Sequence, residues 1–201
     1  GPSIPKIFGI NKPAEAVDNS LLPHVTESGV KIMSMNMLLP NATDPVLWRG
    51  PVISGVVKQF WEDVQWGDVD FLFVDMPPGT GDVPLTVFQS LPINGILIVS
   101  TPQSLVSMIV DKAMNMAQMM QVPVLGMVEN MRFLRCPDCG KEIPLFGSDD
   151  HVDNHTVPVL ERIPLDPTVA AACDAGKLEQ AEIDYLAKTA VMLTETFGKK
   201  Q

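Results

Sequence analysis

The strongest constraint on the fold is a short apolar run that ends in an acidic residue. Residues 71–74 read Phe-Leu-Phe-Val, and Asp75, a loop rich in Pro and Gly, and Asp82 follow them. A run that is apolar at every position is typical of an interior strand of a parallel sheet, because both of its faces are covered. At the end of such a strand a carboxylate can hold Mg²⁺, while glycines let backbone N–H groups approach phosphate. A Pro/Gly turn with a helix cap is the simpler interpretation of the same residues.

Apolar strands alternate with helical patterns along the rest of the chain. Beyond 71–74, the predicted strands are 95–99, 122–128 and 157–163, and residues 30–37 also alternate like a strand. The predicted helices are 48–66, one that begins near Val83 with Asp82 as its cap, 104–120, 168–175 and 181–197. This alternation indicates an α/β fold, a parallel sheet flanked by helices, which we expect to form a single domain over residues 1–201. In helix 104–120 the inward positions are predicted to be Leu105, Met108, Ile109, Met116 and Met119 or Met120.

The composition excludes several classes of partner. With a formal net charge of -10 over 201 residues, the chain lacks the basic face that nucleic acid or an anionic membrane surface requires. No apolar run approaches the roughly 18 residues of a membrane span, so we expect no membrane partner. Three cysteines, two of them in Cys-x-x-Cys, suit a reducing compartment better than a disulfide framework, which predicts a cytoplasmic protein.

Cys136 and Cys139 have the spacing of metal ligands and lie in a loop at about 132–148, the least regular part of the sequence. Zinc and the usual iron–sulfur clusters need four ligands. The third cysteine, Cys173, lies far away on a predicted helix. Two thiols from each of two subunits would complete the set, so the pair suggests a homodimer with a shared metal centre.

Other interpretations of the cysteine loop stay open at this point. A redox dithiol is typical of a helix N-terminus, whereas Pro137 and Gly140 indicate a ligand-loop turn. His151 and His155 are weaker candidates for ligands, because they lie in an acidic polar stretch.

A second candidate site residue, Asn130, lies just after the predicted strand 122–128. The side-chain amide of Asn130 both donates and accepts hydrogen bonds and suits the edge of a nucleotide base, although a turn asparagine is an equal alternative. The lysine loop that cradles phosphates, Gly-x-x-x-x-Gly-Lys-Ser/Thr, is absent from the sequence. The central part of an ATP-hydrolysing site is therefore missing from these 201 residues.

Taken together, these residues resemble the Mrp/ApbC family of P-loop iron–sulfur carrier proteins, relatives of MinD and ParA. The resemblance extends over almost the whole chain, with many motifs in family order. The segments that carry it are 1–5 (Gly-Pro-Ser-Ile-Pro), 48–51 (Trp-Arg-Gly-Pro), 74–82, 101–103 (Thr-Pro-Gln), 128–131 (Val-Glu-Asn-Met), 136–140 (Cys-Pro-Asp-Cys-Gly), 146–147 (Phe-Gly) and 163–167 (Ile-Pro-Leu-Asp-Pro).

The resemblance implies a role for each motif. Asp75 corresponds to the magnesium-binding acidic residue of the catalytic site, and residues 79–82 (Gly79, Thr80, Gly81 and the catalytic Asp82) to the loop that senses the γ-phosphate. Asn130, Pro164 and Asp166 correspond to the site of the purine. Cys136 and Cys139 correspond to the pair that shares a [4Fe–4S] cluster between two subunits. The implied activity is ATP-dependent delivery of such clusters to apo-proteins, with Mg²⁺ and ATP as cofactors.

One part of the family pattern is absent. The family's first strand and its phosphate loop would lie before Gly1, so we expect this chain to be the C-terminal two-thirds of a longer protein. The strand at 71–74 would then lack its neighbour, and we expect no ATP hydrolysis from this chain alone. Two rival functions are a zinc-stapled structural dimer and a MinD/ParA-like positioning ATPase; residues 197–200 hold too few basic side chains to support the latter.

Overall fold

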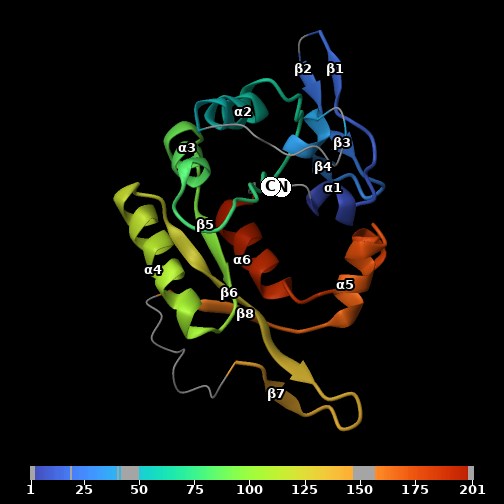
Figure 1. Cartoon of the computed structure of the whole chain (residues 1–201), viewed down its shortest axis with the longest axis vertical. Coiled ribbons are helices and arrows are strands. Elements are labelled where there is room, and N and C mark those ends of the chain that lie inside the picture. The colour runs from blue at the N-terminus through green and yellow to red at the C-terminus, as the bar shows by residue number, and fades with distance from the viewer. Residues whose placement is uncertain (1–2, 19, 40, 42–49, 147–156, 199–201) are drawn as a thin grey trace. The chain divides into compact units, whose positions relative to one another are not determined.

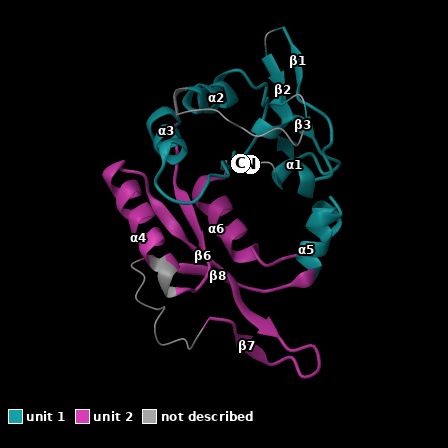
Figure 2. Cartoon of the chain, viewed as in Figure 1, with its two compact units in different colours: residues 1–91, 168–182 teal, residues 92–167, 183–201 magenta. Residues whose placement is uncertain are grey.

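The computed structural model describes residues 3–18, 20–39, 41, 50–146 and 157–198. The chain forms two compact units, which are coloured separately in Figure 2. Unit 1 comprises residues 1–91 and 168–182, and unit 2 comprises residues 92–167 and 183–201. The expectation of a single domain over 1–201 stays a prediction. The predicted His151 and His155 and the Trp48-Arg49 motif lie outside the described residues.

Unit 1 combines short helices with two small antiparallel ribbons (Figure 1). Its elements are α1 (Ser3–Ile7), β1 (Glu15–Val17), β2 (Ser20–Leu22), β3 (His24–Val25), β4 (Lys31–Ile32), η1 (Met35–Leu38), α2 (Gly50–Glu62), α3 (Asp82–Ser90), most of α5 (Pro167–Asp174) and η3 (Leu178–Gln180). The β1–β2 ribbon was not predicted, and of the strand-like segment predicted at 30–37 only Lys31–Ile32 forms a strand, since Met35–Leu38 form η1. Ile10, Ile32 and Met37 form a buried hydrophobic cluster in this unit.

The predicted interior strand at 71–74 is wrong for this structure. These residues have no strand assignment, and Phe73 is 70% exposed. The Phe71 and Phe73 rings stack against each other, with centroids 6.3 Å apart. A strand exists only where a neighbour takes up its backbone N–H and C=O groups. Within the described part of the chain, no strand pairs with this run.

The helix after the glycine loop begins one residue earlier than predicted. Asp82 is the first residue of α3 rather than its cap. The N-cap position is held by Gly81, so no side chain caps the start of the helix. Pro84 lies in the first turn and is buried, as its missing N–H allows. The carboxylate of Asp82 therefore lies in the first turn, where the helix dipole favours a negative charge.

Unit 2 is built around a four-stranded sheet in which β6 (Val124–Arg135) is central (Figure 1). β6 pairs in parallel with β5 (Ile96–Ser100) and β8 (Val159–Pro164), as the predicted parallel sheet requires. Its last residues extend further and pair with β7 (Glu142–Pro144) in an antiparallel hairpin. The predicted strands 95–99, 122–128 and 157–163 are confirmed, although β6 is much longer than expected.

Two helices complete unit 2, α4 (Ser104–Met119) and α6 (Ala187–Phe197). The core joins Ile98 of β5, Val110 of α4 and Met127 of β6. The predicted inward face of α4 is partly wrong, because Met108, Ile109 and Met119 are exposed. Among the described side chains of this helix the buried ones are Val110 and Ala117, with Val106 and Met114 packed against the core. The predicted Leu105 lies outside the described side chains. Helix α6 also begins six residues later than predicted. Among the described residues no helix is both long and apolar enough to cross a bilayer.

A buried carboxylate ties β6 to β8. Glu129 is 1% exposed, and its Oε2 atom accepts a hydrogen bond of 2.9 Å from Nε of Arg162. Nε of the buried Arg132 lies 3.7 Å from the same oxygen. Removing a carboxylate from water is costly, and two arginines are needed to offset that cost. Without the Glu129 carboxylate, the buried positive charge of Arg132 would lose a nearby negative charge that offsets the cost of its burial.

We expect Glu129→Gln to lower the free energy of unfolding by about 2 to 3 kcal/mol, because it removes one partner from a buried ion cluster. The matched control is Glu142→Gln, which breaks the exposed 3.2 Å pair with Arg135. That change should cost less than about 0.5 kcal/mol. Urea denaturation of the three proteins measures both effects. Equal losses for the two variants would show that Glu129 is no more important to the fold than a surface charge.

Candidate functional site

β6 carries two of the predicted functional motifs from the sheet into an exposed hairpin. Asn130 lies where the parallel ladders end, since β5 pairs up to Glu129 and the pairing with β8 is interrupted between Glu129 and Phe133. β6 continues beyond this interruption in its pairing and ends at Arg135, directly before Cys136. Figure 1 shows the β6–β7 hairpin projecting beyond the rest of the sheet.

The loop of this hairpin is a tight turn closed by backbone hydrogen bonds. The N–H of Cys136 donates to the carbonyl of Lys141, and the N–H of Gly140 donates to the carbonyl of Cys136, both at 2.9 Å. Gly140 has a φ of +71°, in the left-handed region that favours glycine. The turn therefore brings the two cysteines to one end of the hairpin, as the ligand-loop interpretation predicted.

The two thiols are accessible and are held together. Cys139 is exposed and Cys136 is half-buried. The backbone N–H groups of Cys139 and Asp138, followed by the Cys139 thiol, donate to the Cys136 sulfur and lower the pKa of that thiol below its ordinary value. Stabilisation of the thiolate favours metal binding, because the thiolate is the form that coordinates.

The hairpin offers two candidate ligands rather than four. Within the described ranges, no group of three or more His, Cys, Asp or Glu side chains is arranged to hold a metal ion. Cys173 is half-buried on α5, in the other unit. A four-coordinate centre at Cys136 and Cys139 therefore requires ligands from elsewhere.

Asn130 shapes the backbone as well as offering polar groups. Its Oδ1 atom accepts the N–H of Met131 at 3.0 Å, and Met131 has a φ of +54°. The turn role leaves the predicted base-recognition role open, because the bond to Met131 involves only the oxygen. The amide nitrogen keeps two N–H donors that suit an acceptor on a base edge.

The predicted purine residues lie at the end of the neighbouring strand. Pro164 ends β8, is buried and pairs with Phe133 of β6. Asp166 accepts a hydrogen bond of 2.7 Å from the hydroxyl of Tyr185, and this bond raises the pKa of the tyrosine. Tyr185 is the chain's single tyrosine, and no spacing in the sequence marked it. Glu129, in contrast, could have been found from the sequence, because it is an acidic residue that directly follows the predicted apolar strand 122–128.

The remaining predicted residues lie in unit 1. Asp75, Thr80, Gly81 and Asp82 are exposed. Gly79 has a φ of +90°, and no atom of the described residues lies within 4 Å of the position that a Cβ atom would take. The loop thus leads with open backbone into the N-terminus of α3, an arrangement that suits an anion. The structure therefore groups the phosphate-type residues in one unit and the base-type and thiol residues in the other.

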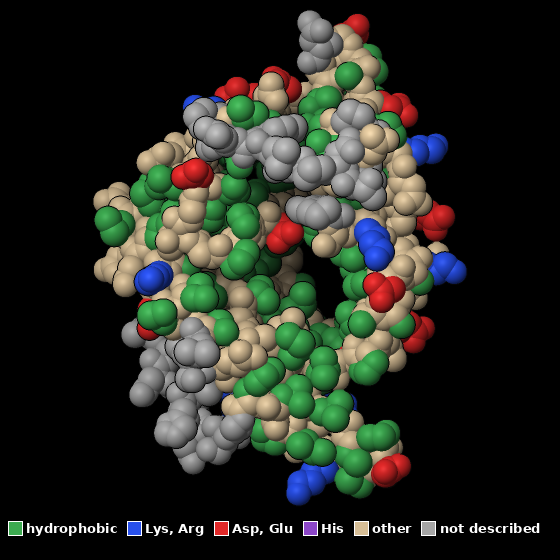
Figure 3. Space-filling model, viewed as in Figure 1, with side chains coloured by type: hydrophobic (Ala, Val, Ile, Leu, Met, Phe, Trp, Pro, Cys, Tyr) green, Lys and Arg blue, Asp and Glu red, His purple; other side chains and the backbone are tan. Residues whose placement is uncertain are grey.

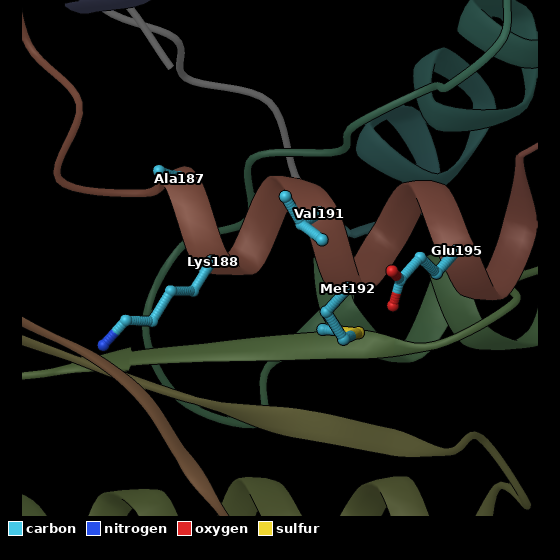
Figure 4. Close-up of a pocket in the computed structure, with 5 residues that line it drawn as sticks. All are labelled: Ala187, Lys188, Val191, Met192 and Glu195. Atoms are coloured by element: carbon cyan, nitrogen blue, oxygen red, sulfur yellow. The ribbon is translucent and has the colours of Figure 1, made fainter.

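An open hollow along α6 is lined by none of the predicted site residues. It has a volume of about 390 Å³ and is lined by Ala187, Lys188, Val191, Met192 and Glu195 (Figure 4). One cation, one carboxylate and three apolar side chains from a single helix offer no convergent polar set. We therefore place the candidate chemistry at the strand ends and the hairpin.

The fold is that of an α/β protein with parallel strand pairing, and the site is an exposed two-thiol hairpin at the end of its central strand. The chain belongs to the family described as NUBPL iron-transfer P-loop NTPase, within the ParA group, whose model matches residues 1–196. The predicted resemblance and fold class are confirmed by this match and by the relatives below.

Curated relatives carry the name iron-sulfur cluster carrier protein. The one from Clostridium perfringens is 42% identical over 191 residues, which cover 90% of this chain and 67% of that protein. The one from Methanocaldococcus jannaschii is 43% identical over 181 residues, covering 88% of this chain and 62% of that protein. The chain therefore spans about two thirds of the length of these relatives.

A solved structure gives the same fold. It is a nucleotide-binding protein from Archaeoglobus fulgidus in complex with ADP and with Co, and it matches with a TM-score of 0.78 and 38% identity. The match covers 92% of this chain and 74% of that one. The likeness extends over almost the whole chain.

We expect Cys136 to react with iodoacetamide at a lower pH than a cysteine in an unstructured peptide, because hydrogen bonds to its sulfur lower its pKa. The folded hairpin favours the thiolate, so its stabilisation is complete above the unfolded pKa and is lost as the pH falls through the lower folded pKa. Mass spectrometry of the alkylated peptide against pH measures the midpoint. In urea the midpoint should rise to the ordinary thiol value, whereas identical midpoints in both states would contradict the hairpin geometry.

Proposed function

We propose that this chain is the thiol-bearing part of an iron–sulfur cluster carrier. Its Cys136 and Cys139 would hold a [4Fe–4S] cluster together with the same pair from a second copy, and the cluster would be passed to apo-proteins. The observation that carries the proposal is the exposed two-thiol hairpin on a chain of an iron-transfer family.

Ligand number supports a shared cluster. A four-iron cluster is usually held by four cysteine thiolates, and this hairpin supplies two. Two copies related by a two-fold axis would each present the same pair, which is the geometry of an isologous dimer. Hydrophobic side chains gather over the hairpin region in Figure 3, and Ile143 of β7 is 44% exposed. Exposed apolar surface beside the thiols favours docking of a second hairpin.

A cluster held in this way would be easy to give away. Each copy contributes two bonds, and the thiols lie at an accessible hairpin end rather than inside a closed cage. An acceptor's thiolates can therefore approach and replace the carrier's ligands one after another, as in ordinary thiolate exchange. The cluster is thus cargo, and the protein's task is to hold it and to expose it.

The nucleotide part of the proposal concerns the whole protein. Asp75 would hold Mg²⁺, residues 79–82 would face the γ-phosphate, and Asp82 would take part in hydrolysis. Asn130 would donate to the base, with Pro164 and Asp166 beside it. ATP, when bound, would supply a change of charge that biases the dimer's conformation. The open backbone at Gly79 and the amide N–H groups of Asn130 fit these roles.

The setting follows from the same chemistry. Free thiols and a labile cluster need a reducing compartment, so we propose a cytoplasmic carrier that forms one P-loop NTPase-like domain in the whole protein. Its partners would be a second copy of itself and apo iron–sulfur proteins, without nucleic acid or membrane.

Anaerobic reconstitution with iron and sulfide tests the proposal. We expect a brown protein with about one four-iron cluster per two chains, as four thiolates per cluster require. Cys136→Ser should lose the cluster while the far-ultraviolet circular dichroism stays unchanged. Cys173→Ser is the matched control, because that thiol lies on α5 in the other unit, and it should retain the iron.

The outcomes separate the proposal from its rivals. Iron content unchanged in Cys136→Ser would refute the ligand assignment. A colourless protein that takes up zinc and refuses iron would favour a structural zinc staple. Loss of the absorbance on adding an apo-acceptor, with its appearance in the acceptor, would distinguish a carrier from a protein that merely stores a cluster.

A further inference from the structure

We propose that the Cys136–Cys139 hairpin of a single chain is also a binding site for the soft monovalent ion Cu(I), in a two-coordinate dithiolate geometry. The inference rests on the thiol pair alone and does not depend on the proposed cluster transfer. Copper would occupy one chain without a second copy, and it would compete with the cluster for the same two sulfurs.

Coordination number carries the argument. Zinc and iron–sulfur clusters require four ligands, and within the described residues the hairpin offers no third His, Cys, Asp or Glu to either of them. Cu(I) is a soft ion that prefers thiolates, and it is stable with two sulfur ligands in a line. The described hairpin therefore offers half of the ligands that zinc or a cluster needs and both of the ligands that Cu(I) needs.

The local geometry suits one shared ion. Cys136 and Cys139 lie on one tight turn, and hydrogen bonding from Cys139 is part of what lowers the pKa of the Cys136 thiol. The hydrogen bonds from Cys136 to Lys141 and from Gly140 to Cys136 close the turn and hold both residues at one end of the hairpin. Because the turn itself holds both cysteines at one end of the hairpin, two thiolates of one chain can be presented to a single ion.

Access and charge also favour a small cation. Cys139 is exposed and Cys136 half-buried, so a copper donor can reach the pair directly. Two thiolates carry a charge of minus two, and a single monovalent ion leaves the site anionic. In the binding step two S–H bonds break, two Cu–S bonds form, and the protons pass to water. No electron moves, and copper remains Cu(I) throughout.

Occupation by copper would have a specific consequence. The two sulfurs that a second copy must share through a cluster would be committed to a metal that needs no further ligands. Copper would therefore block cluster loading without unfolding the chain. The hairpin would hold either one copper ion per chain or one cluster per two chains.

The test is an anaerobic titration of the chain with Cu(I) as its acetonitrile complex, against bathocuproine disulfonate as a coloured competitor. We expect one copper per chain to be withheld from the competitor, with a native mass of one chain plus one copper. Cys136→Ser and Cys139→Ser should each lose this retention. Cys173→Ser should keep it, because that thiol is not part of the hairpin.

Three results would overturn the proposal: release of all copper to the competitor, retention unchanged in Cys136→Ser, or copper found only in species of two chains. Preloading with Cu(I) should also abolish the brown colour on later treatment with iron and sulfide. If copper binds and no cluster ever forms, the cluster-carrier function fails and the copper site stands. If the cluster forms and copper is not retained, only the copper site fails.

Discussion

Pairing of β6 on both edges is the constraint on which the functional part of unit 2 depends. β5 and β8 hold its first half in a parallel sheet, and β7 holds its last residues in a hairpin. Between these two parts lies a short irregular stretch, where Met131 has a positive φ and Asn130 accepts its N–H. One strand thus supplies a polar amide at the sheet's edge and a thiol pair beyond it. The buried carboxylate of Glu129 fastens the strand to β8 just before the irregular stretch.

The thiol pair follows a different physical principle, that of an incomplete coordination shell. Hydrogen bonds from the turn stabilise a thiolate at Cys136, but nothing else in the described chain completes a four-ligand set. Under the proposed function, an incomplete shell is a means of association, because the missing ligands would come from a second copy. It is also a means of release, because a partner's ligands can leave. A closed four-ligand site would hold its metal more firmly and would lack both properties.

Local chemistry made much of unit 2 predictable. Apolar runs placed β5, β6 and β8, and Pro137 and Gly140 indicated the turn that holds the cysteines. The motifs also gave the family, which the match over residues 1–196 confirms. These features depend on nearest neighbours in the sequence, so a pattern of residue types is enough to find them.

Features that depend on partners were not predictable. The run at 71–74 has the composition of a buried strand, but a strand needs a neighbour, and none pairs with it in the described chain. Met108 and Met119 are apolar and lie on α4, yet packing buries Val110 and Ala117 instead. Spacing alone did not predict that Tyr185 bonds to Asp166 or that Arg162 reaches Glu129, because both contacts join residues far apart in the chain.

The most direct test of the account is native mass spectrometry of the reconstituted protein, prepared without oxygen. The account predicts a species with the mass of two chains plus four irons and four sulfides, which is absent when either Cys136 or Cys139 is replaced by serine. Mixing wild-type chains with a double Cys136→Ser, Cys139→Ser variant should give no cluster in the mixed dimer, because only two thiols remain. A four-iron cluster on a single chain, or in the mixed dimer, would contradict the shared site.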